Sequence, residues 1–156
     1  MNVALELINL LKERRLRLSV CESASCGALS SSIGEVAGAS SVFAGGFISY
    51  SNEVKIKLVG VSEKTIFKYG AVSEQTAKEM CLQTNQKFNT DIAISITGNA
   101  GPQGSENKEV GLFYIGIAIK DFAIVKKVTL NSNERTFNRF SIAWEAISYL
   151  IELIKK

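Results

Sequence analysis

The sequence predicts an α/β fold formed by a single domain over residues 1–156, with a mixed central sheet between two helical layers, a three-layer α/β/α sandwich. Helical patterns alternate with nearly continuous apolar runs such as "DIAISIT", and such runs are typical of strands buried on both faces. The runs "VGLFYIGIAIK" and "FAIVKKVTL" predict a hairpin that turns near Lys120 and Asp121, so the sheet should be mixed. A chain of this length buries about 70% of its unfolded surface, which favours one core.

The first half of the chain alternates helix and strand. Apolar residues recur on one face between Val3 and Leu11, which predicts an amphipathic helix. "RLSVC" is typical of a short strand, and a helix is expected over 25–36, ending before Gly38. "SVFAGGFISY" predicts the next strand, in which Gly45 and Gly46 indicate a bend or a close backbone approach.

The second half continues the same alternation. Helices are expected over 52–58, 63–69 and 74–88, with Ser62 and Ser73 as N-caps. "DIAISIT" predicts a strand, which is followed by the glycine-rich loop "GNAGPQGSENKE" and then by the hairpin. A last helix should begin near Glu134, because large apolar residues then repeat at three- and four-residue spacing.

Composition limits the partners and the compartment. The net charge of +3 is spread along the chain, which gives little support for a nucleic-acid partner and suits a phosphate-bearing small molecule equally well. Neither a signal peptide nor a membrane-spanning apolar run is visible, so we expect a cytoplasmic protein without a membrane partner. Cys21, Cys26 and Cys81 are expected to be reduced, and Cys21 and Cys26 to be buried small hydrophobes.

The sequence contains no histidine. This excludes a Ser-His-Asp triad, a Cys-His pair and an HExxH zinc site. If the protein is a hydrolase, its general base is Lys, Asp, Glu or Tyr.

Three segments could carry chemistry. Ser23 follows a strand and precedes a helix, where a hydroxyl is exposed and backbone N–H groups are free; the simpler interpretation of Ser23 or Ser25 is an N-cap. In "YSNEVKIK", Lys55 lies one turn into a helix, where a lysine is usually solvated. In "TGNAGPQGSENK" glycines recur after a strand, in a pattern that matches neither nucleotide-binding fingerprint and is equally compatible with a plain turn.

Together, these segments favour a serine–lysine pair. Without histidine, an amine is the economical activator of a serine, and Ser-Lys pairs are a known variant of the triad. Lys55 would have to be neutral, which costs roughly 4 kcal/mol at about 1.36 kcal/mol per pKa unit and requires a partly buried pocket. The strand ends that carry Ser23, Tyr50 and Thr97 could meet at one edge of the sheet, where α/β proteins bind ligands.

Five separated blocks of the sequence resemble one family in order and spacing. "CESASCG", "VAGASSVFAGGFISYSNEVKIKLVGV", "YGAVSEQTAKEM", "SITGNAGPQG" and "KEVGLFYIGIA" resemble the carboxy-terminal domain of the competence/damage-inducible CinA family, whose stand-alone members are nicotinamide-nucleotide amidases. The resemblance implies an α/β/α fold and hydrolysis of the carboxamide of nicotinamide mononucleotide to the nicotinate nucleotide and ammonia, without a metal or cofactor. It also implies a homodimer or larger homo-oligomer, and a chain of the short type, without the amino-terminal domain of longer members.

The resemblance also implies roles for individual residues. Ser23 matches the nucleophile and Lys55 its partner, while Tyr50 is expected to tune Lys55 or to contact the ring. Glu22 is expected to orient the site by hydrogen bonding, and N–H groups between Ala24 and Gly27 to stabilise the oxyanion. The remaining expected substrate-binding residues are Ser25, Gly27, Ser51, Asn52, Thr97, Gly98, Ala100, Gly101, Arg135 and Arg139. The two arginines would suit the substrate phosphate; the alternative is a solvated helix face.

Departures from the family pattern leave alternatives open. The family's CTGG is "ASCG" here, so Cys26 stands where a glycine is usual and could hinder the carboxamide. Asn99 and Gln103 also differ from the family pattern, without removing a proposed reacting group. The rival class is a non-catalytic nucleotide-binding or protein-interaction member associated with competence or DNA damage. A third possibility is an amidase with another pyridine or nucleotide amide as substrate.

Overall fold

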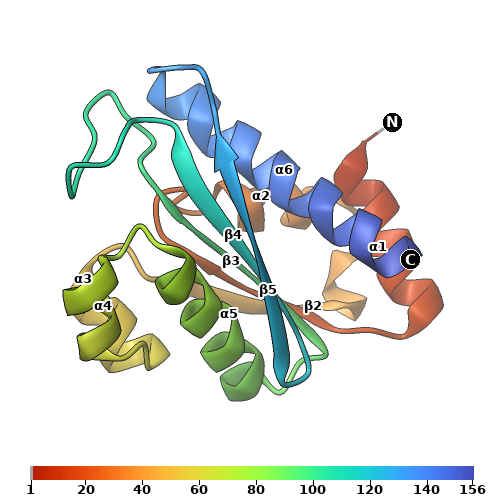
Figure 1. Cartoon of the computed structure of the whole chain (residues 1–156). Helices are drawn as coiled ribbons and strands as arrows, with labels where there is room; N and C mark the ends of the chain where they lie inside the picture. Colours follow the sequence, from red (N-terminus) through yellow and green to blue (C-terminus); the bar gives the residue numbers. More distant parts are fainter. Residues whose placement is uncertain (1) are drawn as a thin grey trace.

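The computed structural model describes residues 2–156 and contains one five-stranded sheet (Figure 1). The strand order is β2-β1-β3-β4-β5. β1 pairs in parallel with β2 and β3, while β4 pairs antiparallel with both β3 and β5, so the predicted mixed sheet is confirmed. The strands are β1 (Leu18–Glu22), β2 (Phe43–Ile48), β3 (Ile92–Gly98), β4 (Leu112–Ile119) and β5 (Phe122–Thr129).

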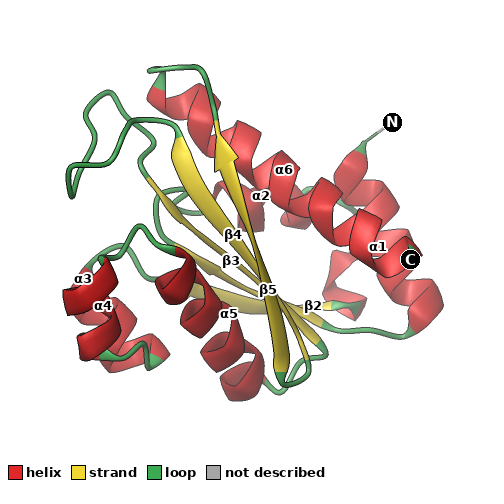
Figure 2. Cartoon of the chain, viewed as in Figure 1, coloured by secondary structure: helices red, strands yellow, loops and turns green. Residues whose placement is uncertain are grey.

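Helices cover both faces of the sheet, which confirms the three-layer arrangement (Figure 2). One layer contains α1 (Val3–Arg14), α2 (Ala28–Gly34) and α6 (Arg135–Lys155), which pack on one another. On the opposite face α5 (Glu74–Phe88) packs on β1, β3, β4 and β5, with α4 (Glu63–Tyr69) beside it. The short elements are η1 (Ala39–Ser41), α3 (Asn52–Val54) and the π-helical turn η2 (Lys55–Val59).

The central strands are buried because helices cover both faces of the sheet, whereas the edge strands β2 and β5 are partly exposed. All five residues of β1 are buried, and only the last residue of β3 is partly exposed. The largest cluster lies under α1, α2 and α6, and smaller clusters around Met80 and Cys81 lie under α5. A β-carbon on Gly46 would collide with Val20 of β1, so the predicted close backbone approach is confirmed.

Most predicted elements are present, with local corrections. The helix expected from residue 25 begins only at Ala28, because residues 23–27 form turns. Ser73 caps α5 by accepting a hydrogen bond from the Thr76 N–H, as predicted. Ser62 occupies the predicted N-cap position of α4, but its side chain accepts no capping hydrogen bond. Cys26 was expected to be buried but is exposed.

Within residues 2–156, no helix combines the length and the apolar character that crossing a membrane would require.

Candidate active site

Three parallel strands end at the same edge of the sheet, and the residues that follow them surround one cavity of about 390 Å³. The convergence expected for Ser23, Tyr50 and Thr97 is therefore present. Four further segments contribute lining residues: the helical segment after β2, the loop before α5, the loop after β3 and the start of α6. Their lining residues are Ala24, Asn52, Lys55, Ala71, Val72, Gly98, Asn99, Ala100, Gly101, Gln103, Ser105, Glu106 and Arg135.

Lys55 and Ser23 form a buried pair in this cavity. The Lys55 Nζ lies 2.9 Å from the Ser23 Oγ, 2.8 Å from the Ser49 carbonyl oxygen and 3.1 Å from that of Tyr50. Lys55 is only 1% exposed, so a solvated face position is wrong for it. Burial lowers the pKa of the Lys55 amine to about 8.

The contacts of Lys55 suit a neutral amine as well as an ammonium ion. An ammonium group donates three hydrogen bonds and accepts none. After loss of one proton, two N–H bonds remain for the carbonyls of Ser49 and Tyr50, and the lone pair can face the Ser23 hydroxyl. The arrangement therefore supplies a base within hydrogen-bond distance of the serine oxygen.

Glu22 fixes the turn that carries Ser23. Its fully buried carboxylate accepts hydrogen bonds from the N–H groups of Leu29 and Ser30, each at 2.9 Å, and from the Ser30 hydroxyl at 2.6 Å. These groups lie in the first turn of α2, where a carboxylate is favourable. Glu22 thus caps the helix from the end of β1, and the N-cap interpretation of Ser23 and Ser25 is wrong.

The same turn leaves backbone donors free at the cavity. Ser23 N–H donates to the Ile96 carbonyl and Cys26 N–H to the Ser23 carbonyl. Among residues 2–156, the N–H groups of Ala24 and Ser25 have no acceptor. Because Ala24 lines the cavity next to Ser23, its N–H is a candidate oxyanion donor.

The two arginines of α6 occupy different places. Arg135 donates to the Tyr50 hydroxyl and to the Gly101 carbonyl, both at 2.6 Å, and lines the cavity. Arg139 donates instead to the carbonyls of Ser25 and Cys26, both at 3.1 Å, and does not line it. Arg139 is partly buried against these carbonyls, so a fully solvated position is wrong for it. Arg135 is exposed, and its two hydrogen bonds hold the guanidinium at the cavity.

Several other predicted residues lie outside the lining. Ser25 is fully buried, and Gly27 occupies the N-cap position of α2 in a left-handed conformation, with φ of 95°. The Ser51 hydroxyl accepts a hydrogen bond from the Val54 N–H and caps α3. These residues, like Glu22 and Arg139, support the shape of the turns and do not face the cavity.

Hydrogen bonds to the segment before α5 and to α6 hold the glycine-rich loop and the strand end that precedes it. Thr97 Oγ donates to the Ala71 carbonyl at 2.8 Å, and Asn138 of α6 donates to the Ala100 carbonyl at 3.0 Å. A β-carbon on Gly98 would collide with Phe113, which explains the glycine there. The loop therefore forms one side of the cavity and is fixed there by specific contacts.

Sequence reasoning missed Ala71, Val72 and Glu106 as lining residues. "YGAVSE" stood among the motif blocks, but no residue type in it suggested a role. Glu106 lies in a loop without periodicity, so only its contacts reveal it. Among the described residues, no group of three or more His, Cys, Asp or Glu side chains could hold a metal ion.

Known proteins resemble this chain over nearly its whole length. The profile of the CinA C-terminal domain matches residues 1–154. A CinA-like protein of Kosmotoga olearia is 46% identical over 127 residues, which are 81% of this chain and 31% of that protein. The chain spans about a third of the length of the curated relatives it matches.

Solved structures agree with the fold. The competence/damage inducible protein of Agrobacterium tumefaciens has a TM-score of 0.93 and 29% identity, covering 99% of this chain and 94% of that one. A CinA superfamily protein of Escherichia coli has a TM-score of 0.93 and 26% identity, covering 97% and 88%.

The fold and site define an α/β/α domain with a buried serine–lysine pair at the carboxyl edge of its parallel strands. The chain belongs to the CinA C-terminal domain family.

Proposed function

We propose that the protein hydrolyses the carboxamide of nicotinamide mononucleotide to nicotinate mononucleotide and ammonia. The observation that carries this proposal is the buried contact between Lys55 Nζ and Ser23 Oγ in a chain without histidine. The family resemblance supports an amide of this class as the substrate.

In the first half of the reaction, neutral Lys55 takes the proton of the Ser23 hydroxyl while Oγ attacks the carboxamide carbon. The negative charge that develops on the carboxamide oxygen is stabilised by backbone N–H groups of the turn, with Ala24 the candidate that lines the cavity. Protonated Lys55 then gives its proton to the amide nitrogen, the C–N bond breaks, and ammonia leaves an ester on Ser23.

In the second half, water attacks the ester carbon and Lys55 accepts its proton. The bond between carbon and Ser23 Oγ breaks, and Oγ recovers the proton from Lys55. The products are the nicotinate nucleotide and the original enzyme, so the atoms and charges balance without a further reactant.

Arg135 and Tyr50 support recognition of a nucleotide. The Arg135 guanidinium is fixed at the cavity by Tyr50 and Gly101, and a guanidinium matches phosphate oxygens with paired hydrogen bonds. Tyr50 is 54% exposed and lines the same cavity, which suits contact of its ring with a planar pyridine ring.

The test is ammonia release from nicotinamide mononucleotide by the wild type, Ser23→Ala and Lys55→Ala. We expect turnover by the wild type and a loss of at least about a thousandfold in each variant, because the pair acts as a unit. Lys57→Ala is the matched control, since Lys57 is exposed on the same helical segment. Full activity of Ser23→Ala would overturn the nucleophile assignment.

The alternative is a non-catalytic member that binds a nucleotide or a protein in competence or the response to DNA damage. The relatives are named for competence and damage, which is the association that this alternative assigns to the chain. Saturable binding of nicotinamide mononucleotide without turnover by the wild type would support it. Ammonia release from a panel of pyridine and nucleotide amides would distinguish an amidase with another substrate from one that acts on nicotinamide mononucleotide.

A further inference from the structure

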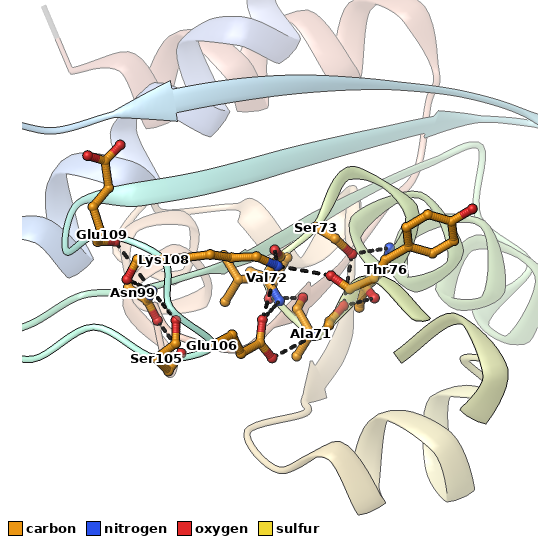
Figure 3. A network of polar contacts seen from close by, with 12 residues as sticks. Ala71, Val72, Ser73, Thr76, Asn99, Ser105, Glu106, Lys108 and Glu109 are labelled. Atoms are coloured by element: carbon orange, nitrogen blue, oxygen red, sulfur yellow. Dashed lines mark hydrogen bonds and ion pairs between the residues drawn. The ribbon is translucent and has the colours of Figure 1, made fainter. Parts of the chain in front are cut away.

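The loop after β3 is fastened to the segment before α5 by two charged side chains, Glu106 and Lys108 (Figure 3). The Glu106 carboxylate accepts hydrogen bonds from the N–H groups of Ala71 at 2.8 Å and Val72 at 3.0 Å. Lys108 Nζ donates to the carbonyls of Tyr69 and Val72 and lies 3.3 Å from the Glu106 carboxylate. We call Glu106 and Lys108 the clasp.

The two side chains have complementary tasks. Consecutive N–H groups form a concave anion site, which the carboxylate fills, while the ammonium group covers carbonyls of the same segment. Residues 70–73 lie outside any helix or strand and have no ladder to satisfy their backbone groups. At Ala71 and Val72 the clasp and Thr97 supply these partners. The Gly70 carbonyl accepts hydrogen bonds from the hydroxyls of Ser73 and Thr76 instead.

The backbone on both sides is shaped for the clasp. Gly70 has a φ of 84° and a ψ of 168°, a combination that essentially only glycine adopts, and a β-carbon there would also meet the Glu106 carboxylate. On the other side, Glu106 and Asn107 adopt left-handed φ values of 57° and 58°. Such values are costly for residues other than glycine, and the contacts of the clasp offset that cost.

Asn99 makes the loop a connected unit. Its Nδ2 donates to the carbonyls of Ser105, Lys108 and Glu109 at 3.2 to 3.4 Å, and its Oδ1 accepts from the Ser105 hydroxyl at 2.6 Å. A displacement at the clasp is therefore transmitted to the start of the loop. Asn99 and Ser105 both line the cavity, as do Ala71 and Val72 on the other side.

We propose that Glu106 and Lys108 are positioning residues, whose clasp holds residues 99–105 as the cavity wall that receives the substrate. The inference deepens the proposed function and rests on it for the identity of the substrate. The clasp itself is a property of the fold.

The carboxylate of Glu106 also acts on Lys55. Burial lowers the Lys55 pKa, and the negative charge of Glu106 opposes this effect. Tyr50 and Arg135 are the other titratable groups that line the cavity with Lys55 and Glu106. Removing the Glu106 charge should therefore lower the Lys55 pKa further, whereas removing Lys108 should not.

The experiment compares Glu106→Gln, Lys108→Met and the control Glu152→Gln, an exposed partner of Lys156 on α6. A glutamine keeps the shape but turns an NH₂ group toward one of the two N–H donors. We expect amide hydrogen exchange at Ala71, Val72 and residues 99–105 to accelerate about tenfold or more in Glu106→Gln, the effect of losing about 1.4 kcal/mol. In Lys108→Met, amide hydrogen exchange should accelerate at the same residues. In the control variant the exchange rates should match those of the wild type.

Kinetics give the second readout. Both clasp variants should raise the KM for nicotinamide mononucleotide about tenfold with little change in kcat, and only Glu106→Gln should move the midpoint of the pH profile of kcat/KM to lower pH. Global unfolding measured in parallel separates local loosening from general destabilisation. Unchanged exchange at Ala71 and Val72 in Glu106→Gln, or an unchanged KM in both variants, would overturn the proposal.

The two proposals fail in different ways. If the wild type neither turns over nor binds nicotinamide mononucleotide, the proposed function fails. Accelerated exchange in Glu106→Gln would then still support the clasp, and unchanged exchange would still refute it.

Discussion

The Nζ atom of Lys55 lies 2.9 Å from the Oγ atom of Ser23, although 32 positions separate the two residues in the chain. Ser23 directly follows β1, and Lys55 opens the π-helical turn that follows α3. π-Helical turns are rare and occur frequently at functional sites. Because the contact is buried, protonation of Lys55 should control both reactivity and stability.

The activity should depend on pH through Lys55. Burial lowers the Lys55 pKa to about 8, so kcat/KM should rise with pH to a plateau above that value. Ammonia release measured between about pH 6 and 10 tests this. Lys55→Arg, whose guanidinium stays protonated, should be inactive throughout. A wild-type kcat/KM that is flat across this range would contradict the role of Lys55 as base.

The free energy of unfolding should also depend on pH through Lys55, in the alkaline range between its folded and unfolded pKa values. The Lys55 pKa is about 8 in the fold and 10.5 without it, so between these values the unfolded chain holds a proton that the folded chain has released. The free energy of unfolding should therefore rise by about 3 kcal/mol across this window, at about 1.36 kcal/mol per unit. Below about pH 8 both states are protonated and the cost of burying the charge is complete.

Denaturant unfolding at about pH 7.5 and 10 measures this rise in the wild type and Lys55→Met. The variant should lack it, while Lys57→Met, at an exposed lysine, should retain it. The same rise in Lys55→Met would show that another group is responsible.

Replacing Glu22 should loosen the turn that holds Ser23. The buried carboxylate accepts two N–H groups and a hydroxyl at the start of α2, and glutamine cannot accept both N–H groups equally well. Glu22→Gln should lower the free energy of unfolding by about 2 kcal/mol, as expected for hydrogen bonds to a charged group. It should also lower kcat. Equilibrium unfolding and turnover measure the two effects, and wild-type values for both would refute the capping role.

Arg135 and Arg139 should affect different kinetic constants. Arg135→Met should raise the KM for nicotinamide mononucleotide about tenfold or more through loss of a phosphate contact. It should change the KM for nicotinamide riboside, which lacks the phosphate, much less. Arg139→Met should instead lower kcat, because Arg139 holds the carbonyls of Ser25 and Cys26 beside Ser23, the proposed nucleophile. Equal effects of Arg135→Met on both substrates would exclude a phosphate role.

Cys26→Gly should be tolerated. Cys26 is exposed, lies outside the cavity lining and has a left-handed φ of 44°, a conformation that suits the glycine usual at this position. The substitution should raise the free energy of unfolding by up to about 1 kcal/mol and leave turnover within about twofold. Cys26→Val should destabilise, because a β-branched residue is strained at positive φ. A large loss of turnover in Cys26→Gly would place the thiol in the reaction.

Local sequence patterns were sufficient to predict most of the helices and strands. The apolar stripe of α1, the buried run of β3 and the hairpin at Lys120 follow from periodicity and turn chemistry, which depend on neighbours in sequence. The late start of α2 could not be predicted this way. It depends on Glu22, whose carboxylate caps the helix from the preceding strand and leaves residues 23–27 free to form turns.

The amino-acid sequence alone limits which residues can act as the general base. With no histidine, only a lysine, a carboxylate or a tyrosine could serve as base, and family resemblance singled out Ser23 and Lys55. Which side chains meet depends on the tertiary fold. In the fold Lys55 is buried, Arg139 binds backbone carbonyls and Arg135 lies at the cavity. Glu106 accepts hydrogen bonds from the N–H groups of Ala71 and Val72. The physical reason is that burial, pKa and hydrogen-bond partners depend on contacts between segments distant in the chain, which no local pattern encodes.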